Sequence, residues 1–240
     1  MKPILDSIVF PCQASFIPRR KGTDNVLILQ DLVYSFSKRK GKNGDMIVKL
    51  DSEKAYDRIE WSFIRETLIF FKFSPHFISL VMSCISSSCI SIFVNGDKTE
   101  AFLPSRGLRQ GDPISPYLFI LCMEYLSIKL MNGIGARKWK GSKAGKRGPT
   151  LSHLFFADDL IFIGKATLAN SQYLSEILDF FCAHSGQKIN KEKSRILFSN
   201  NVDQGTKDII SEFLGFQQTS ELGRYLVIPI SARKHFKASC

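Results

Sequence analysis

The segment HLFFADDLIF (residues 153–162) places two adjacent aspartates between two apolar runs. Short apolar runs of this kind predict strands, so the segment indicates a β-hairpin with Asp158 and Asp159 at its tip. An Asp-Asp pair by itself more often marks a solvated turn, because aspartate favours turns without taking part in chemistry. The apolar residues on both sides weaken that interpretation, since they require a buried hairpin with an acidic tip.

A second apolar run, MIVKL (residues 46–50), is followed directly by Asp51 and predicts another mostly buried strand. If the two strands are neighbours, Asp51 joins Asp158 and Asp159. Carboxylates gathered in this way repel one another and raise each other's pKa, so a hard divalent cation is needed to stabilise them. Two such ions about 4 Å apart activate an attacking hydroxyl and stabilise a leaving pyrophosphate.

The remaining segments predict helices and one further hairpin. Apolar residues at helical spacing predict helices through residues 64–71, 117–131 and 174–181. Ser115-Pro116 is typical of an N-cap and first turn, and the apolar helix behind it should be buried. Asn95-Gly96 between residues 90–94 and 99–103 predicts a hairpin. The order strand, helix, hairpin, helix, hairpin, helix, strand indicates an α+β domain related to the split βαβ sandwich.

The composition favours an enzyme-like core with a polyanionic partner. The chain has 240 residues, 44% of them hydrophobic, and 33 Lys+Arg against 22 Asp+Glu give a net charge of +11. These values exclude wholesale disorder and favour nucleic acid or an anionic membrane face as partner. Two basic segments, residues 37–45 and 137–148, each precede an apolar run that ends in aspartate. They are expected to hold a nucleic-acid backbone beside the metal site.

Membrane association and secretion are not expected. Residues 77–94 lack charges but contain six serines, which makes the stretch too polar for a membrane span. The six cysteines show no zinc or disulfide spacing, so we expect free buried thiols. Because no signal peptide is recognised, the protein is expected to be intracellular, in the nucleus or the cytoplasm.

Four segments in order resemble the successive palm motifs of reverse transcriptases, most closely those of non-LTR (LINE-type) retrotransposons. They are LDSEKAYDRIEW (50–61), GLRQGDPISPYLFIL (107–121), HLFFADDLIF (153–162) and SGQKINKEKS (185–194). SFIPRRKGTDN (15–25) resembles the fingers segment ahead of the palm, and RYLVIPI (224–230) resembles the strand pair that grips the primer. The resemblance covers almost the whole chain.

The resemblance implies a right-hand polymerase fold and a metal-dependent site. The implied parts are a partial fingers segment (1–45), a ferredoxin-like palm that includes a fingers insertion (46–200), and a primer-grip region with the start of a truncated thumb (201–240). Asp51 and Asp158 are implied to bind two magnesium ions, with Asp159 in support. The implied reaction is addition of deoxynucleotides to a primer 3′-hydroxyl, with an RNA template, a DNA primer and deoxynucleoside triphosphates as partners.

Further residues match family positions that contact the substrate. Tyr56 is similar to the aromatic that excludes a 2′-hydroxyl, although a core aromatic is the alternative. Gln110 and Gly111 match positions beside the incoming nucleotide or template, and Arg109 is either a phosphate contact or part of a solvated loop. Lys193 is preferred over Lys191 as the lysine that neutralises the departing pyrophosphate, with a solvated turn as the alternative.

The sequence also departs from the family pattern. Arg19 and Val227 stand where glycine is common, and a branched residue at Val227 is expected to distort its turn. Only Arg19, Arg20 and Lys21 are candidates to hold the triphosphate, and a full thumb and an endonuclease are not recognised, which suggests a retroelement fragment. Whether the chain is an active enzyme therefore stays open. The alternatives are a catalytically inactive remnant that binds nucleic acid and an intron maturase-like splicing factor.

Overall fold

A five-stranded sheet forms the centre of the computed structural model, which describes residues 2–144 and 148–230. The strand order is β6-β7-β1-β8-β9. The strands are β6 (His153–Phe156), β7 (Asp159–Lys165), β1 (Asp45–Leu50), β8 (Arg195–Phe198) and β9 (Gln217–Thr219). β1 is antiparallel to β7 and β8, and β9 is parallel to β8. The first four strands in this order form the split βαβ topology that the sequence predicted.

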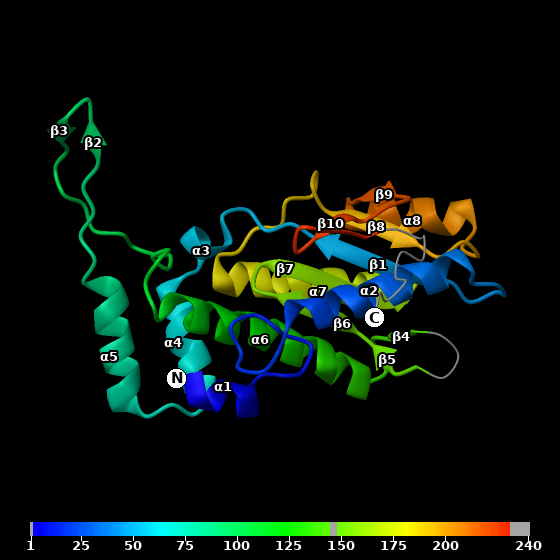
Figure 1. Ribbon diagram of the computed structural model, residues 1–240, viewed down its shortest axis with the longest axis horizontal. Coiled ribbons are helices and arrows are strands. Elements are labelled where there is room, and N and C mark those ends of the chain that lie inside the picture. The colour runs from blue at the N-terminus through cyan, green and yellow to red at the C-terminus, as the bar shows by residue number, and fades with distance from the viewer. Residues whose placement is uncertain (1, 145–147, 231–240) are drawn as a thin grey trace, which may run out of the picture.

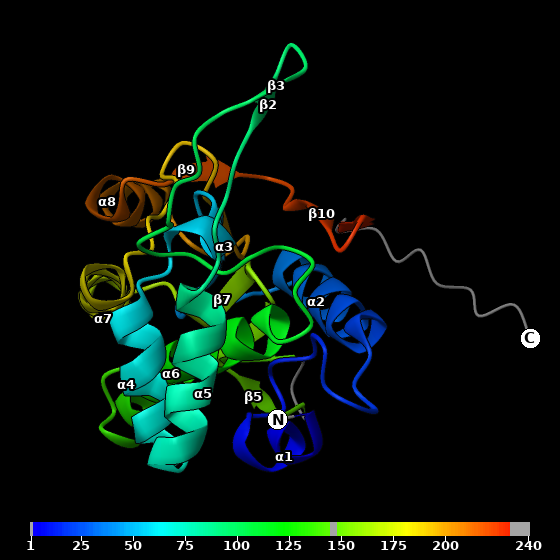
Figure 2. The ribbon, with the colours of Figure 1, turned by 90° about the vertical axis from the view of Figure 1, so that its left-hand side faces the viewer.

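Helices cover both faces of the sheet (Figures 1 and 2). On one face, α4 (Trp61–Phe70), α6 (Ser115–Gly135) and α7 (Leu168–Ser185) share a core cluster with Val48, Leu160 and other strand residues. On the opposite face, α2 (Gly22–Ser37) packs on a second cluster that includes Ile47 and Ile161. Alternate residues of β1 thus enter opposite cores, as the two-residue period of a strand requires.

Smaller elements surround this sandwich. They are α1 (Lys2–Ile8), α3 (Ala55–Arg58), α5 (Pro75–Ser86), α8 (Gln204–Leu214), and the hairpins β2 (Phe93–Val94) with β3 (Asp97–Lys98), β4 (Ser142–Lys143) with β5 (Thr150–Leu151), and β10 (Gly223–Tyr225) with β11 (Ile228–Ile230). The division of the chain at residues 45 and 200 stays a prediction, although β9 from the last part extends the central sheet.

Two details of the predicted elements are wrong. Ser115 is the first helical residue of α6 and not its N-cap, because the Asp112 carboxylate accepts the Ile114 amide at 3.0 Å and forms the turn one residue earlier. The hairpin at Asn95-Gly96 forms, but each of its strands is only two residues long. It projects away from the body of the protein (Figures 1 and 2), where its apolar residues find no sheet to pack on; Phe93 is 72% exposed.

The long apolar helix α6 is a core helix. Among the described helices, it is the one with the length and hydropathy of a membrane span, but 61% of its apolar window is buried inside the protein.

Five cysteines are free thiols, as expected, and Cys240 lies outside the described residues. Of these five, only Cys122 is buried as expected; Cys12 and Cys182 are half-buried, and Cys84 and Cys89 are exposed because they lie on and just after α5, at the base of the projecting hairpin.

Candidate active site

The strands bring Asp51 and Asp159 together. Leu50 pairs with Leu160 in the antiparallel register of β1 and β7, so Asp51 follows directly beside the position of Asp159. Neighbouring residues of an antiparallel pair point to the same face, which sets both carboxylates on one side of the sheet. The Asp51 amide donates to Ser194 Oγ at 3.2 Å, and its carbonyl accepts the Asn190 amide at 2.8 Å. Asp51 is therefore fixed between the end of β1 and the segment 185–194.

Asp158 occupies the tip of the adjacent hairpin. Phe156 pairs with Asp159, which leaves Ala157 and Asp158 as a two-residue turn with Asp158 exposed. Ala157 has a φ of +53°, a conformation that costs free energy for any residue with a Cβ. The side-chain oxygen of Gln13 accepts the Ala157 amide at 3.3 Å and helps hold this turn. The predicted hairpin with an acidic tip is confirmed.

The three aspartates interact electrostatically. Burial raises the pKa of Asp159 above its usual range, the Lys49 ammonium lowers it, and the Asp158 and Asp51 charges raise it again. A cation bound between these carboxylates would relieve the repulsion, and carboxylate oxygens are the ligands that Mg²⁺ prefers. In the part of the chain that the structure describes, no three such side chains are gathered closely enough to form a metal cluster. The three carboxylates therefore have the right chemistry for Mg²⁺, but their described positions do not by themselves form a metal site.

Tyr56 lies beside the aspartates with its ring held in place. The ring stacks on Phe119 with centroids 4.4 Å apart and an interplanar angle of 13°. Burial, and then the charge of Asp158, raise the pKa of Tyr56 to about 12, so the phenol stays protonated at neutral pH. The carbonyl of Tyr56 accepts the Leu108 amide at 2.8 Å, which connects it to the loop before α6.

That loop carries Arg109, Gln110 and Gly111, all exposed. Arg109 and Gln110 line a cavity of about 590 Å³ together with Asp57, Trp61 and the base of the projecting hairpin. Gly107 has a φ of +89°, and a Cβ there would lie 2.8 Å from the Asp57 carbonyl oxygen, so glycine is needed for this close approach. Gly111 has a φ of +91° but open space around it. Polar groups on a cavity of this size suit a nucleotide-sized ligand.

The two candidate lysines lie differently. The segment that contains them runs alongside Asp51, and the exposed Lys193 makes no ion pair with the described aspartates. Lys191 points toward the end of α8, where a Cβ on Gly215 would lie 3.2 Å from Lys191 Cδ. The preference for Lys193 over Lys191 stays a prediction.

One candidate for triphosphate binding is already engaged. The guanidinium of Arg20 binds the Asp6 carboxylate at 3.0 Å and donates to the carbonyls of Val9, Phe10 and Gln13. Arg20 therefore anchors the end of α1 and is not available to a triphosphate.

Sequence reasoning missed Lys49. Its ammonium donates to the Arg224 carbonyl in β10 and lies near Asp159. The alternation in MIVKL was the available signal, because it sets Lys49 two residues before Asp51 and on the same face.

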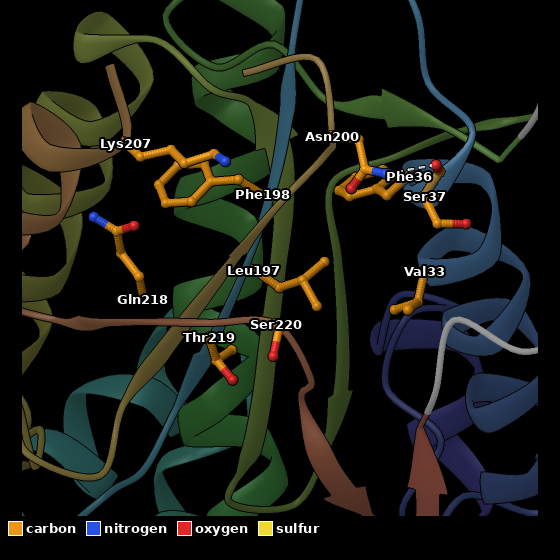
Figure 3. A pocket seen from close by; sticks show the side chains of 10 residues that line it. All are labelled: Val33, Phe36, Ser37, Leu197, Phe198, Asn200, Lys207, Gln218, Thr219 and Ser220. Carbon is orange, nitrogen blue, oxygen red and sulfur yellow. Dashed lines mark hydrogen bonds between the residues drawn. The ribbon is translucent and has the colours of Figure 1, made fainter. Parts of the chain in front are cut away.

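A separate cavity of about 350 Å³ lies between α2, β8 and β9, with Lys207 of α8 also in its wall (Figure 3). The Asn200 side chain, which lines it, donates to the Ser37 carbonyl at 2.7 Å. Phe198 in its wall pairs with Met46 near the start of β1, so this cavity is remote from Asp51.

The sequence is similar to proteins of transposable elements. The chain is 26% identical over 98% of its length to the "Transposon TX1 uncharacterized 149 kDa protein" of Xenopus laevis, and 33% identical over 76% of its length to the "Retrovirus-related Pol polyprotein from type-2 retrotransposable element R2DM" of Drosophila melanogaster. It covers 17% and 16% of these two relatives.

Solved structures share the fold. Telomerase from Candida albicans, in complex with a telomeric RNA fragment, superimposes with a TM-score of 0.57 at 14% identity, over 77% of this chain and 30% of that one. Apo telomerase from Candida tropicalis, truncated from its C-terminal domain, gives 0.56 at 15% identity, over 80% of this chain and 37% of that one. The family model described as "Reverse transcriptase (RNA-dependent DNA polymerase)" matches residues 1–223. The chain belongs to the reverse transcriptase family, and its relatives are polyproteins of non-LTR retrotransposons.

Proposed function

We propose that this chain is an RNA-directed DNA polymerase domain that adds deoxynucleotides to the 3′-hydroxyl of a DNA primer paired with an RNA template. The placement of Asp51 beside the Asp158–Asp159 turn, at one end of a split βαβ sheet, carries the proposal. The retrotransposon relatives and the telomerase fold support it.

Two magnesium ions are proposed as cofactors, held by Asp51 and Asp158 with Asp159 in support. When bound, they would lower the pKa of the attacking hydroxyl and neutralise the leaving pyrophosphate. The protein positions their ligands: Ser194 and Asn190 fix the backbone of Asp51, and Gln13 fixes the turn that carries Asp158.

The surrounding side chains are assigned to the substrates. Tyr56, held by Phe119, is proposed to lie under the sugar and exclude a 2′-hydroxyl. Gln110 and Arg109, on the cavity beside α6, are proposed to bind the nucleotide or template, with Gly111 beside them. Lys193 is proposed to donate a charge-assisted hydrogen bond to the departing pyrophosphate.

Primer extension tests the activity. The purified chain is supplied with an RNA template, an annealed DNA primer, deoxynucleotides and Mg²⁺. We expect extension that requires Mg²⁺ and is lost in Asp158→Asn. The matched control Asp31→Asn removes an exposed aspartate on α2 and should extend normally. Extension by Asp158→Asn at the parent rate would contradict the assigned site. Salt-dependent RNA binding without any extension would instead select the non-catalytic alternative.

Metal binding is tested separately by thermal unfolding. A ligand that binds only the folded state stabilises it, so Mg²⁺ should raise the melting temperature of the parent and of Asp31→Asn. The same addition should have little effect on Asp51→Asn and Asp158→Asn. An equal rise in all four proteins would place the metal elsewhere.

A further inference from the structure

The two basic segments of the sequence meet on one surface. The first follows α2 and the second follows α6. The Arg39 guanidinium donates to Ser142 Oγ at 3.1 Å and to the Lys143 carbonyl at 3.2 Å, which joins the two segments directly. We call six of their exposed cations the distal basic surface: Lys40, Lys42, Arg137, Lys138, Lys140 and Lys143.

This surface lies at the opposite end of the sheet from the aspartates. Asp45, at the start of β1, pairs with Lys165, whereas Leu50 at its end pairs with Leu160 beside the carboxylates. β1 has six residues, so about 20 Å separates the two ends. Figure 1 shows the loop after α2 and the β4–β5 hairpin together at one end of β1, with α3 at the other. The expectation that these segments flank the metal site is wrong, because a whole strand separates each basic segment from its aspartate.

The surface presents positive charge with little local compensation. Neither basic loop, residues 37–44 or 137–148, contains Asp or Glu. Asp45, which follows the first loop, is fully buried, and its carboxylate pairs with Arg39 at 2.8 Å and Lys165 at 2.7 Å. The negative charge of Asp45 is thus neutralised inside the protein, and the exposed cations remain available to a partner.

The loops are held in place by the core. Asn170 accepts the Lys140 amide at 3.1 Å and donates to the Lys140 carbonyl at 2.9 Å, while Trp139 is 1% exposed. Asn201 donates to the carbonyls of Gly41 and Asn43 in the first loop. A surface whose backbone is already ordered loses less entropy on binding than a flexible tail.

We propose that the distal basic surface binds the phosphate backbone of RNA about 20 Å from the catalytic carboxylates. The proposal rests on the proposed function, which supplies an RNA substrate long enough to reach this surface. RNA is favoured over an anionic membrane because none of the exposed large apolar side chains lies in the described residues of the two loops. Stable attachment of a surface to a membrane needs such apolar anchors in addition to charge.

Charge reversal tests the surface. Lys40→Glu combined with Lys140→Glu reverses one exposed cation on each loop. Arg65→Glu combined with Lys72→Glu makes the same change in net charge on α4 and the turn after it, as the matched control. The affinity of each protein for a single RNA of about 40 nucleotides is measured as a function of salt. The distal variant should bind about tenfold more weakly, with a salt slope lower by about 2, while the control stays near the parent.

The readout does not depend on catalysis, so a chain without primer extension still tests the surface. Melting temperatures equal to the parent's establish folding, and Lys40→Gln with Lys140→Gln replaces the distal variant if it unfolds. Equal weakening in distal and control variants would overturn the proposal, since the loss of RNA affinity would then follow from the lower net charge and not from the distal basic surface. Unchanged RNA binding with lost binding to phosphatidylserine vesicles would also overturn it and assign the surface to a membrane.

Discussion

The Lys49 ammonium donates a hydrogen bond to the backbone carbonyl of Arg224, and so joins the strand that leads to Asp51 to the hairpin β10–β11. The same charge lowers the pKa of Asp159, whereas burial and the two other aspartates raise it. Lys49 therefore connects the proposed metal ligands to the segment that resembles a primer grip.

Replacing Lys49 should change the pH dependence of primer extension. In Lys49→Met the pKa of Asp159 loses the lowering influence of the Lys49 charge and rises further, so a larger fraction of this carboxyl is protonated at a given pH. The acid limb of the plot of kcat/KM against pH should therefore move to higher pH. Lys49→Arg keeps the charge and should restore the parent profile. An unchanged acid limb in Lys49→Met, with only the maximal rate reduced, would show that Lys49 acts through packing alone.

Tyr56 should control the choice between deoxynucleotides and ribonucleotides. In Tyr56→Ala the ring that stacks on Phe119 is gone, and room for a 2′-hydroxyl appears. We expect the preference for deoxynucleotides, as a ratio of kcat/KM values, to fall about 10- to 100-fold. Tyr56→Phe preserves the stacked ring and should discriminate like the parent. If Tyr56→Ala kept full discrimination, Tyr56 would be a core aromatic, which was the alternative from the sequence.

The central strands and the acidic turn were predictable because their signals are local. An apolar run followed by aspartate occurs twice, and both runs form strands of one sheet. The two positions where the family commonly has glycine were also informative, because both adopt the positive φ that favours glycine: +68° at Arg19 and +70° at Val227. The expected distortion at Val227 does not occur, since the two-residue turn forms with Leu226 and Val227 both at positive φ.

Contacts between distant segments were not predictable. Lys49 and Arg224 are 175 residues apart, and Gln13 and Ala157 are 144 apart, so no periodicity connects them. The place of the basic loops was misjudged for a different reason. Nearness in sequence to an aspartate was taken as nearness in space, although an extended strand carries the chain about 3.3 Å per residue away.

The turn of the β10–β11 hairpin should be stabilised by glycine. A two-residue turn of this kind needs positive φ at both positions, which is costly for a branched residue such as Val227. Val227 is 82% exposed, so little burial is lost in Val227→Gly. After the entropy cost of glycine, the free energy of unfolding should rise by about 1 kcal/mol.

The neighbouring position supplies the control. Leu226→Gly relieves similar strain but removes a side chain that packs against the core beneath α2, so its net effect should be zero or destabilising. Calorimetry of both variants checks the pair. Destabilisation by Val227→Gly would mean that the exposed valine makes a contact worth more than the strain.

Glu124 should make the stability of the protein fall as the pH rises. This residue on α6 is fully buried; one carboxyl oxygen accepts the Phe10 amide at 3.0 Å, and the other has no hydrogen-bond partner among the described residues. Burial raises the pKa of Glu124 from 4.5 to about 7, despite lowering by the Phe10 amide, Arg20 and Ser127. The folded state thus binds this proton more tightly than the unfolded state. The contribution of Glu124 to the free energy of unfolding is fully present below about pH 4.5. It decreases as the pH rises to about 7, by about 3 kcal/mol.

Glu124→Gln tests this directly, because the amide keeps an acceptor for the Phe10 N–H and never ionises. Urea unfolding at a series of pH values should show the variant more stable than the parent above pH 7 and similar to it near pH 4.5. Glu66→Gln, an exposed glutamate on α4, should follow the parent curve. Parallel curves for the parent and Glu124→Gln would mean that the pKa of Glu124 is the same in the folded and unfolded chains. In that case a neighbouring positive charge would have to stabilise the ionised Glu124 carboxylate. Arg20, whose charge already lowers this pKa, would be the residue to replace next.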